Sequence, residues 1–220
     1  IARDLGARGY AVCNLKYPSR KKPPGDLLDN VEALIDGCFD SEPRRLHFVT
    51  HSLGGIMTRA LIGERRPENL GRVVMLAPPN HGSELVDAYG NAGWFRKIMG
   101  PTAVQLGTDP ASLPNRLGPA DFDVGIVAGS KPVHPLGVWI LDEPSDGTVT
   151  IASARLEGMR DLVVVHRSHS FIMGAPEVIA QVPYFLTNGC FDRTLSSAEF
   201  PDEDLPCSNA AASEYQQGEF

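Results

Sequence analysis

The sequence predicts an α/β fold in which a mostly parallel sheet carries helices on both faces. Three observations support this prediction. Short runs of β-branched and aromatic residues alternate along the chain with segments of helical periodicity. The strand-like runs are apolar almost throughout, as expected for strands that are buried on both faces. The 220 residues are enough for one domain with a full hydrophobic core.

The first half of the chain is predicted to alternate between helices and strands. Gly9 ends the first helix, Asp26 caps the second, and Arg65 and Arg66 suit the end of the third. Pro78 and its neighbour stop the third strand. The predicted helices cover residues 1–8, 26–37 and 56–66, and the predicted strands cover residues 10–15, 46–50 and 71–77.

Residues 80–119 interrupt this alternation. They are rich in Gly, Pro and polar residues, with short helical pieces at 84–89 and 94–99. An insertion here would overhang the carboxyl ends of the strands, where open α/β sheets bind ligands. We therefore expect a lid or substrate-binding cap, with a plain surface excursion as the alternative.

The second half is predicted to complete the sheet. Residues 122–129 and 162–165 form the fourth and fifth strands, and a closing helix begins near Pro176. The folded domain is expected to span residues 1–193. From residue 194 to 220 no apolar period remains, which predicts a disordered tail.

The charge distribution excludes some partners. The net charge is −7, but the tail holds six acidic residues and no basic ones, so the rest of the chain carries only −1. A nearly neutral body offers no electrostatic footprint for nucleic acid and no field for acidic substrates. No apolar run approaches the roughly 20 residues that a bilayer span needs, so no transmembrane segment is predicted.

The cysteines indicate neither a metal site nor a disulfide framework. Cys13, Cys38, Cys190 and Cys207 show no C-x-x-C or Cys/His ligand spacing, which predicts scattered reduced thiols. The chain starts at Ile1 within what reads as the end of an amphipathic helix, which is typical of a fragment. A signal peptide would have been lost with the missing part, so the compartment stays open, with a cytoplasmic location favoured.

A candidate nucleophile lies between the strand at 46–50 and the following helix. The sequence from Thr50 to Gly54, Thr-His-Ser-Leu-Gly, is the G-x-S-x-G nucleophile elbow with Thr50 in place of the first Gly. A sharp turn there would lift the Ser52 hydroxyl towards a cleft. The backbone N–H of Leu53 would point to where an oxyanion forms. The alternative is an ordinary Ser N-cap at a strand-to-helix junction.

Partners for this serine follow in the expected order. A serine hydroxyl needs a base, and the base needs a carboxylate that fixes its tautomer. Asp146 precedes a Gly that permits a tight turn, although Asp142 and Glu143 are rivals and an Asp-Gly pair can serve as a turn alone. His169 lies in the loop beyond the last strand.

The other histidines are alternatives or neighbours of the site. His166 competes with His169 as the base, but it directly continues the strand and is expected to stay in the sheet. His51 and His81 are expected to be structural or to line the substrate pocket, and His51 would flank the nucleophile. His47 and His134 have no motif around them.

Four segments together carry a resemblance to a known family. Residues 1–192 resemble the serine esterase/lipase branch of the α/β-hydrolase superfamily, including small bacterial lipase-like proteins and the lipase-type domain of GPI inositol-deacylases. The segments are Thr50–Gly55, Ala77–Glu84, Ser145–Val149 and His169–Met173. The resemblance implies that Ser52 is the nucleophile, Asp146 the acid, His169 the base, and the Leu53 N–H one oxyanion donor.

The resemblance also sets the expected function. It implies hydrolysis of a small-molecule or lipid carboxylic ester through an acyl-enzyme on Ser52, with no metal and no organic cofactor. An acyltransferase and a non-catalytic binding protein of the same fold are the alternatives. Members of this family begin with further strands, and a His-Gly loop there supplies a second oxyanion donor. Losing one such donor costs on the order of 10²–10³ in rate, so this chain alone is expected to be weak or inactive.

Overall fold

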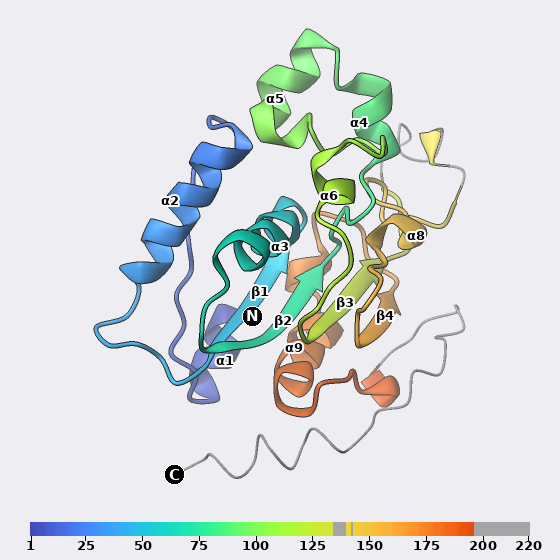
Figure 1. The fold of residues 1–220 in the computed structure, drawn as a ribbon. Coiled ribbons are helices and arrows are strands. Elements are labelled where there is room, and N and C mark those ends of the chain that lie inside the picture. The colour runs from blue at the N-terminus through green and yellow to red at the C-terminus, as the bar shows by residue number, and fades with distance from the viewer. Residues whose placement is uncertain (134–139, 142, 196–220) are drawn as a thin grey trace.

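Four parallel strands form the sheet of the computed structural model, side by side in the order β1-β2-β3-β4 (Figure 1). The structure describes residues 1–133, 140, 141 and 143–195. The strands are β1 (Leu46–His51), β2 (Leu70–Leu76), β3 (Val124–Gly129) and β4 (Asp161–Val165). The predicted strands at 46–50, 71–77, 122–129 and 162–165 are therefore confirmed to within two residues at each end.

The sheet has helices on both faces because its strands are apolar on both sides. In β2, Val73 and Met75 belong to one hydrophobic cluster, while Val74 and Leu76 belong to the other. Helices α2, α3 and α8 contribute to the first cluster, and α1 and α9 contribute to the second (Figure 1). Every residue of β3 and β4 is buried, which confirms the predicted doubly covered parallel sheet.

The helices follow the predicted periodicity. They are α1 (Ala2–Ala7), α2 (Pro24–Asp36), α3 (Leu53–Arg65), α4 (Glu84–Tyr89), α5 (Gly93–Ala103), α6 (Leu113–Arg116), α8 (Ile151–Ala154) and α9 (Pro176–Asn188), with short 3₁₀ turns η1 (Ile172–Gly174) and η2 (Arg193–Leu195). The prediction that Asp26 caps the second helix is wrong. The helix begins two residues earlier, because Pro24 at its first position has the fixed φ that a helix start needs.

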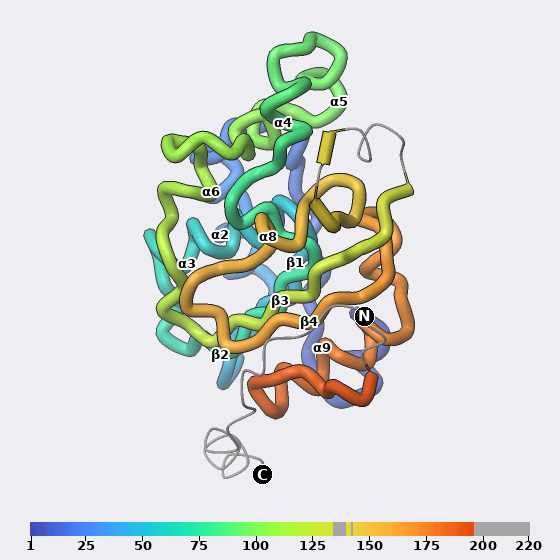
Figure 2. The backbone as a smooth tube through the Cα atoms, turned by 90° about the vertical axis from the view of Figure 1, so that its right-hand side faces the viewer, coloured from blue at the N-terminus to red at the C-terminus, as the bar shows by residue number. Residues whose placement is uncertain are grey.

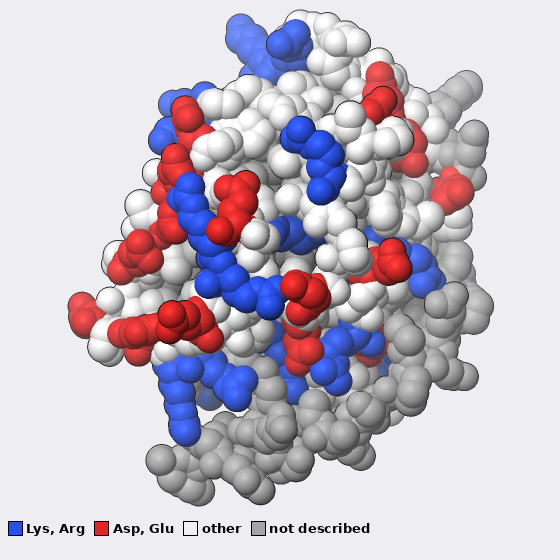
Figure 3. Space-filling model, in the orientation of Figure 1, with Lys and Arg blue, Asp and Glu red and all other residues white. Residues whose placement is uncertain are grey.

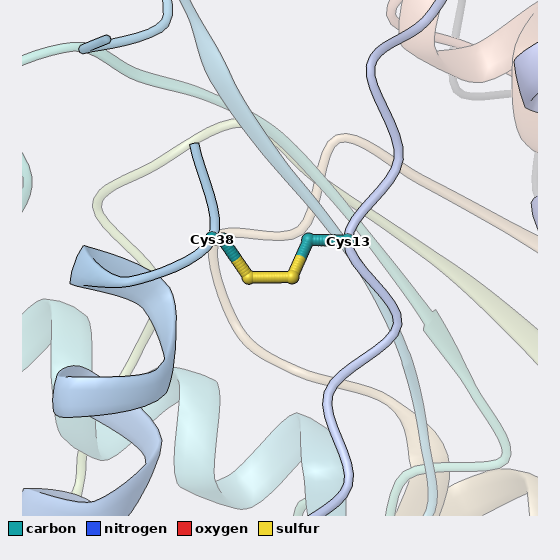
Figure 4. Close-up of a disulfide and its surroundings, with 2 residues drawn as sticks. All are labelled: Cys13 and Cys38. Carbon is teal, nitrogen blue, oxygen red and sulfur yellow. A yellow bond between two sulfur atoms is a disulfide. The ribbon is translucent and has the colours of Figure 1, made fainter. Parts of the chain in front are cut away.

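The strand predicted at residues 10–15 is not formed. A strand needs a hydrogen-bonded neighbour, and within the described part of the chain no ladder joins this segment to β1, which pairs with β2 alone. Instead, Cys13 is joined to Cys38, just beyond α2, by a disulfide (Figure 4).

The prediction of reduced thiols is therefore wrong. Cys13 and Cys38 lie 25 residues apart, and the fold brings their Cα atoms to 5.9 Å, within the usual range for a disulfide. Cys190 is disulfide-bonded as well. Cys207 and most of the tail predicted at 194–220 lie outside the described residues, as do Asp142 and His134.

Residues 80–119 stand beyond the carboxyl ends of the strands, with α4 and α5 outermost (Figures 1 and 2). The buried side chain of Arg59, on α3, fixes both ends of this excursion to the domain. Its guanidinium donates to the backbone oxygens of Asn80 at 3.1 Å, Pro114 at 3.0 Å and Gly118 at 2.7 Å. The helical pieces predicted at 84–89 and 94–99 are confirmed, and their role as a lid stays a prediction. No helix in the described part of the chain is long and apolar enough to cross a membrane.

Candidate active site

Ser52 occupies a sharp turn between β1 and α3. Its φ of 52° and ψ of −124° lie outside the regions that non-glycine residues favour, and such conformations cost on the order of 1–3 kcal/mol. The Ser52 amide donates to the carbonyl of Leu76 on β2 at 2.9 Å. Ser52 stands at the N-cap position of α3, yet its side chain makes no capping hydrogen bond. The hydroxyl is therefore available for another partner.

Small residues let the helix and the sheet meet closely around this turn. A Cβ added to Gly54 would lie 3.4 Å from the Thr50 Cβ, and one added to Gly55 would lie 3.1 Å from Pro78. Thr50 thus contacts the Gly54 position at an ordinary van der Waals distance. Since the approach is still possible, Thr50 can stand where the elbow pattern has Gly.

Asp146 is held in place by the backbone of its own turn, independently of its contact with His169. Its side chain is only 1% exposed, and its Oδ1 accepts the backbone N–H groups of Thr148 at 2.9 Å and Val149 at 2.8 Å. Gly147 has a φ of +92°, which permits this tight turn. Gly129 permits the close approach of β3, because a Cβ there would lie 2.7 Å from the Asp146 Cβ. Asp146 Oδ2 accepts neither of these backbone N–H groups and is left for a side-chain partner.

His169 joins the carboxylate to the serine. Its Nδ1 lies 2.7 Å from Asp146 Oδ2, and its Nε2 lies 3.0 Å from Ser52 Oγ. The carboxylate favours the tautomer that carries the proton on Nδ1, which leaves Nε2 free to accept the serine proton. The His169 amide also donates to the Asp146 carbonyl at 3.1 Å, so backbone and side chain fix the same pair.

The rival residues lie elsewhere. Glu143 is exposed and makes no contact with His169 among the interactions of the described residues. His166 lies just past the end of β4 with an exposed side chain, 3.4 Å from Ser130 Oγ. Of the predicted acids and bases that the structure describes, Asp146 and His169 contact each other, and only His169 contacts Ser52.

His51 contacts His169, from the side of the imidazole ring and of the backbone. Its Nε2 lies 2.9 Å from the His169 carbonyl oxygen, and the two imidazole rings are 4.8 Å apart. Burial, together with the positive charge that His169 can carry, lowers the pKa of His51 to about 4. His51 is therefore neutral near pH 7 and can donate its Nε2 proton to that carbonyl.

His81 is not part of this group. Its side chain is exposed, and its Nδ1 lies 3.2 Å from Asn115 Oδ1 in the excursion. A role for His81 in binding substrate stays a prediction, as does such a role for His51.

The Leu53 N–H is the first of α3. The first amides of a helix have no partner within the helix, and their dipoles favour negative charge. They are suited to receive an oxyanion next to Ser52. No group of three or more His, Cys, Asp or Glu side chains among the described residues is arranged to hold a metal ion.

Two contributions to the site were missed in the sequence. One is the set of hydrogen bonds that Arg59 donates to the excursion. The sequence indicates them only through the position of Arg59 on the buried face of α3. The other is the bond between His51 and the backbone of His169, which joins residues 118 positions apart. No local sequence pattern predicts such a contact.

Comparisons with known proteins were informative only at the level of structure. No family model matches the sequence, and no curated protein matches it. Among solved structures, phospholipase PlaB from Legionella pneumophila matches with a TM-score of 0.61 over 98% of this chain, at 16% sequence identity. The chain has the α/β-hydrolase fold.

Two further matches have lower TM-scores. The chain also matches the esterase PF2001 from Pyrococcus furiosus, with a TM-score of 0.48 and 14% identity over 75% of this chain and 62% of that one. The mature lipase BlEst2 from Bacillus licheniformis matches with a TM-score of 0.46 and 22% identity over 79% of this chain and 71% of that one. This chain spans 58% of the length of PlaB. The likeness to GPI inositol-deacylases stays a prediction.

Proposed function

We propose that the protein is a serine hydrolase that cleaves carboxylic esters through an acyl-enzyme on Ser52. One observation carries the proposal. Ser52 Oγ, the His169 imidazole and the Asp146 carboxylate form a continuous chain of contacts at 3.0 and 2.7 Å. The serine stands on a strained strand-to-helix turn, as an elbow nucleophile does.

In the acylation step, Ser52 Oγ attacks the carbonyl carbon of the ester while His169 Nε2 takes the hydroxyl proton. The imidazolium is stabilised by Asp146 Oδ2, which stays ionised. The carbonyl oxygen becomes an oxyanion and accepts a hydrogen bond from the Leu53 N–H. His169 then gives the proton to the leaving alcohol, and the acyl group stays on Ser52.

In the deacylation step, the same groups act on water. His169 takes a proton from a water molecule, whose oxygen attacks the acyl carbonyl, and then returns the proton to Ser52 Oγ. The carboxylic acid leaves. The resemblance implies a second oxyanion donor from a His-Gly loop, and such a donor contributes on the order of 10²–10³ in rate.

The fold and one similar structure support lipid esters as substrates. PlaB is a phospholipase, and the excursion at 80–119 stands over the edge of the sheet that carries Ser52. We therefore include lipid esters among the substrates. A transferase would use the same acyl-enzyme, and adding a primary alcohol to the assay separates the two, because a transferase forms the new ester in preference to the free acid.

Labelling with a fluorophosphonate probe, followed by peptide mapping, tests the proposal. We expect the label on Ser52, and we expect Ser52→Ala and His169→Ala to abolish it. Ser170→Ala and His166→Ala are matched controls, because both side chains are exposed next to the site and should leave labelling unchanged. If Ser52 stays unlabelled in the folded chain, both alone and extended by an upstream segment with the His-Gly loop, the proposal fails.

A further inference from the structure

Helix α5 presents large apolar side chains to solvent. Trp94 and Ile98, one helical turn apart, are 53% and 52% exposed, and Met99 beside them is 38% exposed. Phe95 points the other way and is buried, with ring contacts to Tyr89 and Trp94. The helix is thus anchored by one aromatic side chain and leaves three apolar side chains uncovered.

Basic side chains surround this apolar group. Arg96 and Lys97 are exposed on α5 itself. The segment Arg20–Lys22 packs against the end of the helix, where Thr102 Oγ1 donates to the Lys22 carbonyl at 2.8 Å and a Cβ on Gly100 would lie 2.5 Å from Arg20 Cα. Together these segments contribute five basic residues. Figure 3 shows blue side chains gathered over α5 and near the start of α2, at the top of the view.

Acidic residues do not offset this charge within the two segments. Residues 17–25 and 89–108 contain no Asp or Glu, although the chain as a whole is acidic. Asp87 and Asp109, just outside these segments, line the same hollow as Arg96, so the basic character is concentrated on Lys97 and Arg20–Lys22 beside the apolar side chains of α5. These segments lie beyond the carboxyl ends of the strands, which is also the end of the sheet where Ser52 lies (Figure 1).

We propose that the exposed face of α5, together with Arg20–Lys22, docks the protein on an anionic lipid interface. Trp side chains favour the boundary between headgroups and acyl chains, and a helix with apolar residues flanked by Lys and Arg lies in that plane. Lys and Arg near an anionic surface add electrostatic attraction. A nucleic acid would satisfy the charge but leave Ile98 and Met99 uncovered, so a lipid surface fits better.

The proposal deepens the proposed function, because docking there would place Ser52 on the side facing the lipid. Its test does not depend on that function. The Ser52→Ala chain is mixed with vesicles of phosphatidylcholine alone, or with about one third phosphatidylglycerol, and bound protein is measured by sedimentation. We expect binding to the anionic vesicles that weakens as salt is raised, and little binding to the neutral ones.

Two variants address the two halves of the surface. Each basic residue near the surface contributes on the order of fivefold in affinity, so Arg96→Glu with Lys97→Glu should weaken binding by at least about 25-fold. Trp94→Ala should weaken it about tenfold through lost apolar burial. The matched control is Arg3→Glu with Arg44→Glu, which changes the net charge equally at exposed positions near α1 and before β1, at the opposite end of the sheet.

Several outcomes would overturn the proposal. They are equal binding to neutral and anionic vesicles, unchanged binding by the α5 variants, and an equal loss in the control variant. Binding to single-stranded DNA without binding to vesicles would assign the surface to nucleic acid instead. Circular dichroism and the melting temperature of each variant show that it is folded, and the side chains substituted on α5 and in the control are exposed.

Discussion

Replacing Asp146 by Asn should inactivate the site without disturbing the fold, and the reason lies in how the carboxylate is bound. Asp146 Oδ1 accepts two backbone N–H groups, from Thr148 and Val149, while Oδ2 faces His169 Nδ1. An Asn has one acceptor oxygen, and the two amides require it at the Oδ1 position. The Asn NH₂ group must then point at His169.

This orientation forces the wrong tautomer. An NH₂ group can only donate, so His169 Nδ1 becomes the acceptor and the ring proton moves to Nε2. Nε2 can then no longer take the proton of Ser52 Oγ. The equivalent change in a serine protease triad lowers kcat about 10⁴-fold, which corresponds to about 5 kcal/mol in activation free energy.

Hydrolysis of p-nitrophenyl acetate measures this loss, and fluorophosphonate labelling of Ser52 gives an independent rate. The matched control is Glu143→Gln, which removes an exposed carboxylate three residues away and should leave both rates unchanged. A thermal melt should show that Asp146→Asn remains folded. If the variant kept its rate within tenfold of the parent, Asp146 would not be the acid of the site.

Three further predictions concern stability. Burial and His169 lower the pKa of His51 to about 4 in the folded chain, so the unfolded chain binds more protons below about pH 6.5. The free energy of unfolding should therefore fall by up to about 3 kcal/mol as the pH drops from about 6.5 to about 4. Urea titrations should find less of this loss in His51→Gln. Arg59→Met leaves carbonyl oxygens at both ends of the excursion without their donor and should cost about 1–3 kcal/mol for each buried carbonyl that stays unpaired, seen as a lower melting temperature; an unchanged value would contradict the anchoring role. Cys13→Ser removes the Cys13–Cys38 disulfide and should cost about 3 kcal/mol through the 25-residue loop, and an unchanged denaturation midpoint would refute this.

The sequence brings out Ser52, Asp146 and His169 as candidates because the proposed chemistry restricts the residue types, and the structure places these three side chains in contact. Only a few side chains can act as nucleophile, base and acid, and their order along an α/β chain is fixed by the strands that carry them. Asp146 was favoured over Glu143 because of the following Gly, and that Gly does hold the positive φ that the turn needs. The strands of the sheet were predictable for a similar reason, since burial on both faces leaves a continuous apolar run.

The misses concern contacts between distant parts of the chain. Residues 10–15 have the composition of a strand, but strand formation depends on a neighbouring strand. The pairing of Cys13 with Cys38 depends on the path of α2, which brings the two Cα atoms together. The local sequence predicts neither the absence of a neighbouring strand nor the second cysteine of the disulfide.

The turn at Ser52 also depends on contacts between distant parts of the chain. Ser52 and Ala77 both have positive φ, and both follow the ends of adjacent strands, β1 and β2. The Ser52 amide donates to Leu76, and the Ala77 amide donates to Val127 on β3. The ladder thus continues one residue past each strand and holds both strained residues in place. The strain at Ser52 is therefore balanced by the register of three strands, and a pentapeptide with Thr50 instead of Gly can form the same turn because the sheet imposes it.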